Sequence, residues 1–228
     1  MKAVVFAEKE KVEVKDVPDP EITEPTDAIV KVKLSAICGS DLHIYRAELP
    51  AMPRMTIGHE CVGRVEDVGS GVKIFKPGDR VIVACAFSCG ICPFCRRNTF
   101  FFCSNGGVFG NMNTRGSLIP GVQAEYVRVP FADATLLKIP EKLSDEDVIF
   151  ITDILPTGYT AVDRGDIRPG DTVAIIGAGP VGLCAMECAK LFGPSKIFSI
   201  DKEAYRLEVA RKRGAIPLNA SKKDPASG

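Results

Sequence analysis

The sequence lacks an excess of either charge, a membrane-spanning hydrophobic run and an export signal. Its 29 basic and 29 acidic residues cancel, which gives no reason to expect nucleic acid or an anionic membrane as a partner. The uncharged run Thr172–Met186 is too short to cross a bilayer. The first ten residues hold too short an apolar stretch for a secretory signal. We therefore predict a cytoplasmic protein without a membrane or nucleic-acid partner.

Histidine is scarce, whereas cysteine is abundant. The chain has two histidines, His43 and His59, and nine cysteines among 228 residues. In a chain without an export signal, this many cysteines favours metal ligands or buried thiols over disulfides. Both histidines stand near a cysteine along the chain, so mixed Cys/His metal ligation has to be considered.

The first 130 or so residues show the pattern of β structure. Short Val/Ile-rich runs are separated by turn-forming residues, and several of the runs alternate between apolar and polar positions. Irregular strands with long connections predict a partly open barrel or a sandwich rather than a parallel sheet. The expected strands are Lys2–Phe6, Ala28–Ile37, Cys61–Val68, Arg80–Cys85 and Ala124–Val129.

The pattern changes near residue 140. Ser144 is a candidate N-cap, followed by three acidic residues and a helical stretch. After it, strand and helix alternate as in a parallel, doubly wound sheet, which predicts an α/β domain. The expected elements are a strand at Thr172–Ile176, a helix at Val181–Phe192, a strand at Lys196–Ile200, a helix at Glu203–Arg213 and a weak strand at Ile216–Leu218.

A glycine-rich turn between the first of these strands and its helix has the dinucleotide-binding pattern G-x-G-x-x-G. It comprises Gly177, Ala178, Gly179, Pro180, Val181 and Gly182. Glycines there permit a tight turn and the approach of a pyrophosphate, and the helix N-terminus supplies N–H donors. The alternative interpretation is a plain strand–turn–helix connection.

An acidic residue supports the dinucleotide interpretation. Asp201 ends the next expected strand, where its carboxylate can accept the ribose hydroxyls of NAD and would repel the 2′-phosphate of NADP. Lys202 and Arg206 lie close by and weaken that preference. On the alternative interpretation, Asp201 is a solvated side chain.

Four cysteines within residues 88–103 have metal-ligand spacing. Cys89, Cys92, Cys95 and Cys103 suit a closed tetrahedral zinc site, and Arg96 and Arg97 can offset its negative charge. An iron–sulfur cluster and buried thiols are the alternatives, although the long gap before Cys103 counts against the cluster. A site with four protein ligands has no position for a substrate, so the chemistry is expected elsewhere.

A second group combines both histidines with a cysteine. Cys38-Gly-Ser-Asp-Leu-His43 follows an expected strand, and Gly58-His59-Glu60 precedes another. Taken singly, each side chain has an ordinary structural interpretation: Cys38 as a buried thiol, His59 as a core histidine and Glu60 as a solvated charge.

Taken together, these motifs resemble the zinc-dependent medium-chain alcohol dehydrogenases. The resemblance rests on the two segments above, the four-cysteine lobe, the run Asp153–Tyr159 and the glycine turn. It implies a GroES-like, partly open β-barrel catalytic domain over residues 1–150, with a zinc lobe at 85–110. Residues 151–228 would form the N-terminal half of a Rossmann domain. The run Ala124–Pro130 looks most like the glutathione-independent formaldehyde dehydrogenase branch.

The resemblance also implies roles for individual residues. A catalytic Zn²⁺ would be held by Cys38, His59 and Asp153, and a structural Zn²⁺ by the four cysteines of the lobe. Glu60 would be an exchangeable fourth ligand or a neighbour of the metal, and Asp41 would orient the His59 ring. Protons would leave through Ser40 and a cofactor ribose to His43; the alternative interpretation of His43 is a surface histidine on a short helix. Thr157 would lie beside the nicotinamide.

Two main functions therefore remain open at this point, beside a ferredoxin-like electron carrier that would follow from the iron–sulfur interpretation of the lobe. The first is an oxidoreductase that transfers hydride between a short alcohol, or a hydrated aldehyde, and NAD. The second is a catalytically inactive zinc-binding remnant of such an enzyme, because family members are roughly half as long again as this chain and form homo-oligomers through segments beyond it. The full set of Cys38, His59 and Asp153 favours the enzyme, because an inactive remnant has no need of these ligands.

Overall fold

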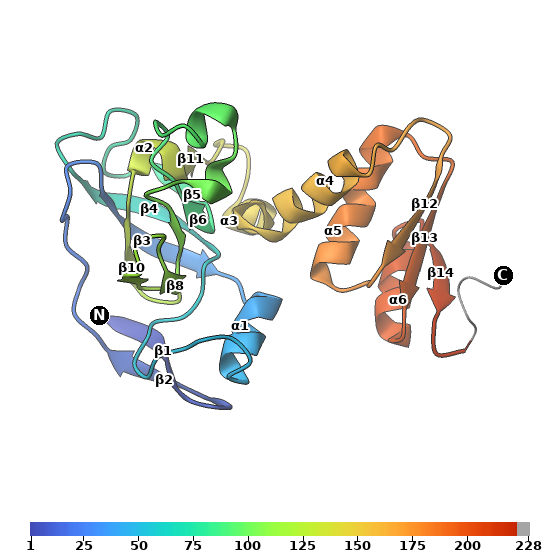
Figure 1. Ribbon diagram of the computed structural model, residues 1–228, viewed down its shortest axis with the longest axis horizontal. Coiled ribbons are helices and arrows are strands. Elements are labelled where there is room, and N and C mark those ends of the chain that lie inside the picture. The colour runs from blue at the N-terminus through green and yellow to red at the C-terminus, as the bar shows by residue number, and fades with distance from the viewer. Residues whose placement is uncertain (223–228) are drawn as a thin grey trace. The chain divides into compact units, whose positions relative to one another are not determined.

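The structure, a computed structural model, describes residues 1–222 of the chain (Figure 1). It divides into two units, Met1–Thr152 and Asp153–Gly228. Within the described residues, no helix is long and apolar enough to cross a membrane.

The first unit is built on a five-stranded antiparallel sheet. Its strand order is β10-β3-β4-β5-β11. Isolated bridges Ala3–Ala124 and Val5–Thr56 join a separate hairpin to the segments around it. The sheet strands are β3 (Ala28–Ser35), β4 (Cys61–Val68), β5 (Arg80–Val83), β10 (Tyr126–Val129) and β11 (Leu136–Lys138), and the hairpin is β1 (Lys2–Glu8) with β2 (Lys11–Asp16).

Short helices and ribbons connect these strands. Helix α1 follows β3, and the cysteine lobe lies between β5 and β10. The helices are α1 (Gly39–Tyr45), α2 (Ala132–Thr135) and α3 (Asp145–Val148), with 3₁₀ helices at Cys95–Arg97, Phe100–Phe102 and Ile149–Thr152; the ribbons pair β6 (Ala86–Phe87) with β7 (Gly107–Val108) and β8 (Asn111–Met112) with β9 (Leu118–Ile119).

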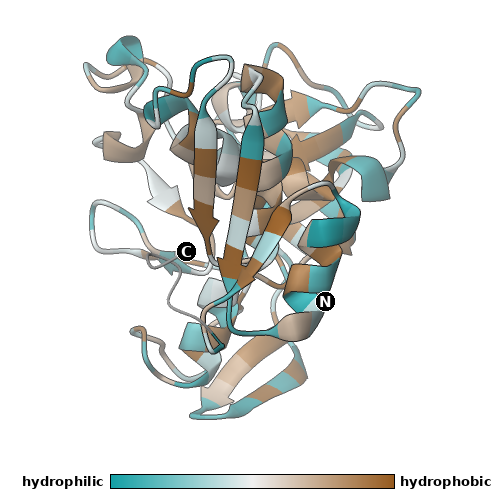
Figure 2. Cartoon of the chain, turned by 90° about the vertical axis from the view of Figure 1, so that its right-hand side faces the viewer, coloured by the Kyte–Doolittle hydropathy of each residue, from teal (hydrophilic) through white to brown (hydrophobic). Residues whose placement is uncertain are grey.

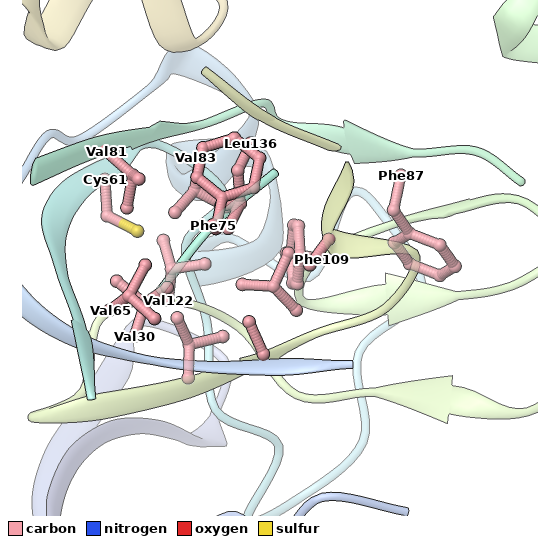
Figure 3. Close-up of a cluster of buried hydrophobic side chains, with 14 of the residues drawn as sticks. Val30, Cys61, Val65, Phe75, Val81, Val83, Phe87, Phe109, Val122 and Leu136 are labelled. Atoms are coloured by element: carbon pink, nitrogen blue, oxygen red, sulfur yellow. The ribbon is translucent and has the colours of Figure 1, made fainter. Parts of the chain in front are cut away.

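Successive side chains of β5 point to opposite faces of the five-stranded sheet, and each face packs against an apolar core. Val81 and Val83 join the larger core, whereas Ile82 joins a smaller core on the other side. The larger core gathers Val30, Cys61, Phe109 and other apolar side chains from the strands and the lobe (Figure 3). Both faces of β5 are therefore covered by apolar side chains.

The second unit is a three-stranded parallel sheet with helices. Its strand order is β12-β13-β14, with Thr172 opposite Lys196 and Phe198 opposite Ile216. Figure 2, turned toward this part of the chain, shows hydrophobic stretches along the strands. The elements are α4 (Ile154–Arg164), β12 (Thr172–Ile176), α5 (Pro180–Ala189), a 3₁₀ helix at Lys190–Phe192, β13 (Lys196–Asp201), α6 (Ala204–Lys212) and β14 (Ile216–Asn219).

These elements confirm the predicted fold class: mixed α/β structure with open sheets, an antiparallel one followed by a partial parallel, doubly wound one. The structure also corrects some bounds. Strand β3 ends at Ser35 rather than Ile37, because the chain turns toward α1. The long helix predicted to start at Val181 starts at Pro180 and tightens into a 3₁₀ turn after Ala189. Strand β2 was not predicted at all.

Candidate active site and metal centres

Strand pairing brings Cys38 and His59 to the same place in the first unit. Ser35, at the end of β3, lies opposite Cys61, at the start of β4. The residues after Ser35 and those before Cys61 therefore meet at one end of the antiparallel ladder. Ligand atoms of Cys38, His59 and Glu60 lie within 4.8 Å of one another, and both His59 and Glu60 are buried.

The His59 ring has a different neighbour at each nitrogen. Nδ1 lies 3.6 Å from Oδ1 of Asp41, and Nε2 lies 3.4 Å from the hydroxyl of Ser40. Asp41 is buried in the first turn of α1, where its other oxygen accepts a 2.9 Å hydrogen bond from the backbone N–H of Cys38. A carboxylate at Nδ1 favours the tautomer whose Nε2 lone pair is available to a metal.

The Cys38 thiol is prepared for ionisation. A hydrogen bond with His59 lowers the pKa of Cys38, and the Ser40 hydroxyl and backbone lower it further, while burial acts in the opposite direction. The thiolate is the form of cysteine that binds metal ions. Cys38 and His59 thus offer the two donor types that zinc prefers.

Ser40 and His43 are three residues apart on α1, one turn of the helix. His43 is exposed, and its Nδ1 lies 2.5 Å from Oε2 of Glu48. This hydrogen bond to His43 is the main reason why the pKa of Glu48 is lowered. Helix α1 therefore carries both Ser40, which lies beside the buried His59 ring, and the exposed His43.

Asp153 and Thr157 belong to the second unit. Asp153 directly follows the buried Thr152 and precedes α4 as its N-cap residue. The Thr157 hydroxyl donates to the Asp153 carbonyl at 2.9 Å and to its carboxylate at 3.2 Å. Thr157 thus fixes the Asp153 carboxylate at the start of this helix.

The four cysteines of the lobe converge closely. Their sulfurs are 3.5 Å apart for Cys92 and Cys95, 3.8 Å for Cys92 and Cys103, and 3.5 Å for Cys89 and Cys103. Sulfurs at the usual Zn–S distance of about 2.3 Å in a tetrahedron are about 3.8 Å apart, so the spacing fits a zinc ion. Arg96 and Arg97 follow on the exposed side of the 3₁₀ turn.

The lobe thiols differ in acidity. Backbone N–H groups, those of Cys95 and Ser104 foremost, lower the pKa of Cys92 to about 6. Burial raises the pKa of Cys103 to about 12. A metal ion bound by both must therefore displace a proton from Cys103 near neutral pH, whereas Cys92 has already lost its own.

The three glycines of the turn in the second unit have different tasks. Gly177 has a left-handed φ of 92°. A Cβ atom at Gly182 would lie 1.8 Å from the Gly177 carbonyl oxygen, so this position has no room for any side chain. At Gly179, the N-cap of α5, a Cβ atom would have its nearest neighbour, a guanidinium nitrogen of Arg206, 3.8 Å away. Pro180 occupies the first turn of the helix, and Val181 is partly exposed beside it. The open position at Gly179 is where a phosphate group could approach the backbone.

Asp201 closes this turn from the end of β13. Its carboxylate accepts hydrogen bonds from the backbone N–H groups of Glu203 at 2.8 Å and Ala178 at 2.7 Å, which lower its pKa. Arg206 lies 3.9 Å from the same carboxylate, and its Nε donates to the Tyr205 hydroxyl. One acidic side chain therefore links both ends of the strand–turn–helix unit.

Sequence analysis missed one contributor to the first site, Gln123, which donates its side-chain amide toward Asp41. Gln123 is far from the site in sequence and carries no motif. Gly58, already part of the motif that precedes β4, has a φ of 91° directly before His59.

Comparison with known proteins shows which family the chain resembles. Residues 24–141, more than half of the chain, match the alcohol dehydrogenase GroES-like domain. An uncharacterized zinc-type alcohol dehydrogenase-like protein, AdhB of Bacillus subtilis, is 42% identical over 96% of this chain and 60% of its own length. The glutathione-independent formaldehyde dehydrogenase of Pseudomonas aeruginosa is 37% identical over 98% of this chain and 60% of its own length.

Solved structures show the same likeness. The alcohol dehydrogenase TADH from Thermus sp. ATN1 is 48% identical, with a TM-score of 0.95 over 100% of this chain and 65% of its own. A GroES-like domain followed by a strand–glycine turn–helix unit defines the medium-chain dehydrogenase class. The chain belongs to the zinc-type alcohol dehydrogenase family. It spans about 60% of the length of these relatives.

Proposed function

We propose that the chain is the catalytic part of a zinc-dependent oxidoreductase that transfers hydride between a short alcohol, or a hydrated aldehyde, and NAD. The observation that carries this proposal is the cluster of Cys38, His59 and Glu60 ligand atoms within 4.8 Å of one another. The identity to formaldehyde and alcohol dehydrogenases supports the substrate class.

The residues of the cluster fit a catalytic zinc ion. Cys38 and His59 would bind it together with the Asp153 carboxylate, and Glu60 would be a neighbour or an exchangeable ligand. A thiolate and a carboxylate would neutralise the two charges of Zn²⁺. Bound there, zinc would supply Lewis acidity toward an alcohol oxygen, and NAD would supply the hydride acceptor.

The chain's own groups would hold and move the proton. Ser40 lies beside the His59 ring and would accept the proton of the substrate hydroxyl in a hydrogen bond. His43, one turn further along α1, is exposed and would pass a proton to solvent. Asp41, whose Oδ1 lies 3.6 Å from Nδ1, would orient the His59 ring beside the Ser40 hydroxyl.

The second unit would bind the cofactor. Gly177, Gly179, Pro180, Val181 and Gly182 would cradle the pyrophosphate at the N-terminus of α5. The Asp201 carboxylate would accept the ribose hydroxyls, Arg206 would border the same end, and Thr157 would lie beside the nicotinamide.

The four cysteines of the lobe would hold a second, structural zinc ion, which gives two zinc ions per chain. We further propose that the protein is cytoplasmic, where nine cysteines stay reduced. Homo-oligomers, as in the family, form part of the same proposal.

The test is zinc per chain, measured on protein purified without added metal. Two ions are expected in the wild type, one in Cys38→Ser and one in Cys103→Ser. Reduction of NAD by short alcohols should be lost in Cys38→Ser and retained in Cys103→Ser. A wild-type chain with one ion, lost in Cys103→Ser, would show instead a zinc-binding remnant without a catalytic site.

A further inference from the structure

Gln123 and its neighbours contact three segments around the first site: residues 56–58 before His59, Ala36 before Cys38, and Asp41 in α1. Its backbone N–H donates to Ile57 at 3.0 Å, and its neighbours Gly121 and Val122 donate to Thr56 at 2.9 Å and Gly58 at 3.0 Å. The stretch Gly121–Gln123 therefore supports the loop that ends one residue before His59.

The Gln123 side chain reaches the other two segments. Its amide nitrogen lies 3.4 Å from the carbonyl oxygen of Ala36, two residues before Cys38, and 3.3 Å from Oδ2 of Asp41. Because both partners only accept hydrogen bonds, the nitrogen end of the amide must face them. Oδ1 of Asp41 faces the His59 ring, so Gln123 holds the carboxylate by its opposite oxygen.

Gly58 makes room for this side chain. A Cβ atom at position 58 would lie 2.4 Å from Cγ and 2.9 Å from Cδ of Gln123. These are atoms of the stem and not of its mobile end, so the glutamine could not keep its position. The glycine beside His59 and the glutamine are thus packed as a pair.

We propose that Gln123 is a positioning residue that fixes the Asp41 carboxylate and, through it, the His59 tautomer with hydrogen on Nδ1. Nε2, which lies 3.4 Å from the Ser40 hydroxyl, is then left with its lone pair. The consequence for metal binding rests on the proposed catalytic zinc site, whereas the consequence for the His59 ring does not.

The test is Gln123→Met, which keeps the length of the side chain and removes its donor. The chain has two histidines, so ¹⁵N labelling of histidine gives two ring systems, and His43 serves as an internal reference. We expect the wild-type His59 ring to be protonated on Nδ1 and the variant to hold a mixture of tautomers. Affinity of the first site for zinc should fall about tenfold, as for other partners of metal ligands, while the lobe keeps its affinity.

The matched control is Glu125→Met on the same segment. Glu125 is exposed, and its carboxylate accepts a 2.7 Å hydrogen bond from the backbone N–H of Lys2. Glu125→Met should lower the free energy of unfolding about as much as Gln123→Met does, and it should leave the NMR signals of the His59 ring unchanged. If Gln123→Met does not fold, Gln123→Asn carries the test, since its shorter amide cannot reach Asp41 but keeps the backbone hydrogen bonds.

An unchanged His59 tautomer in both Gln123 variants overturns the proposal. A wild-type chain that holds only the lobe metal contradicts the proposed function, but the ring signals of His59 still decide the role of Gln123. A tautomer change with unaltered zinc affinity would support the role of Gln123 in setting the His59 tautomer and overturn only its consequence for metal binding.

Discussion

The backbone N–H of Ala178 donates a 2.7 Å hydrogen bond to the carboxylate of Asp201. The glycine turn after β12 is thereby tied to the end of β13, and Glu203 donates to the other oxygen at the start of α6. Asp201 thus has a structural task before any cofactor binds, and its charge contributes to the stability of the second unit.

Asp201→Asn should lower the free energy of unfolding of the second unit by about 1–2 kcal/mol near neutral pH, because the charged acceptor of two N–H groups is lost. The two backbone hydrogen bonds lower the pKa of Asp201 in the folded state. Its contribution is therefore present above the unfolded-state pKa and is lost as the pH falls through the folded-state value. Urea unfolding from neutral to acid pH should show wild type and variant converging at low pH. A constant difference would contradict this explanation.

Alanine substitutions in the glycine turn should separate folding from cofactor binding. Gly182→Ala should prevent the second unit from folding, because its Cβ would overlap the Gly177 carbonyl. Gly177→Ala should lower the free energy of unfolding by about 1–2 kcal/mol, because alanine disfavours the left-handed backbone conformation at this position. Gly179→Ala should leave the free energy of unfolding nearly unchanged but weaken NAD binding, since it fills the open side of the turn. Circular dichroism and NAD titration measure the two effects, and equal losses in all three variants would refute the assignment.

Zinc binding to the lobe should release protons unevenly. At neutral pH, the Cys103 thiol, with its pKa raised to about 12, gives up a proton, whereas Cys92, with a pKa of about 6, is already a thiolate. Zinc affinity should fall steeply below pH 6, where Cys92 is protonated as well. Calorimetric titrations in buffers of different ionisation enthalpy count the protons. The count should rise as the pH falls from 7 to 5, and a flat count would contradict the assignment.

The buried carboxylate of Asp27 should be essential to the first unit. One of its oxygens accepts hydrogen bonds from the backbone and hydroxyl of Thr23, from the backbone of Glu24 and from Arg128, and the residue is 1% exposed. Asp27→Ala leaves these donors without their acceptor and should cost about 3–5 kcal/mol of unfolding free energy.

Arg128→Met is the companion variant to Asp27→Ala. It should cost less, because Asp27 keeps three donors. Chemical denaturation of both variants gives the comparison, and a larger loss in Arg128→Met would show that the ion pair dominates.

Hydrophobic patterns were enough to predict the strands whose side chains enter a core. β4 and β12 have the predicted bounds: Val62 and Val65 of β4 are buried, and Ile175 of β12 packs against the core of the second unit. β2 escaped prediction, since Val12 and Val14 are exposed and the strand is set by its pairing with β1. Exposed valines between charged residues give little indication of a buried face.

The site was predictable only in part. Cys38 and His59 were recognised through a family resemblance, and their proximity follows from the pairing of Ser35 with Cys61. Gln123 could not be found in this way, because its amide reaches Asp41 from 82 positions along the chain. Contacts of that kind depend on the tertiary fold and produce no repeating pattern in the sequence.

The sequence separation of these contacts also bears on the order in which the two proposed metal centres would form. The lobe closes a loop of 14 residues between Cys89 and Cys103, whereas Gln123 and Asp41 close one of 82. The longer closure costs about 1.5 kcal/mol more chain entropy. We therefore expect the four cysteines of the lobe to converge early in folding, and the contact between Gln123 and Asp41 to form only after the antiparallel sheet has assembled.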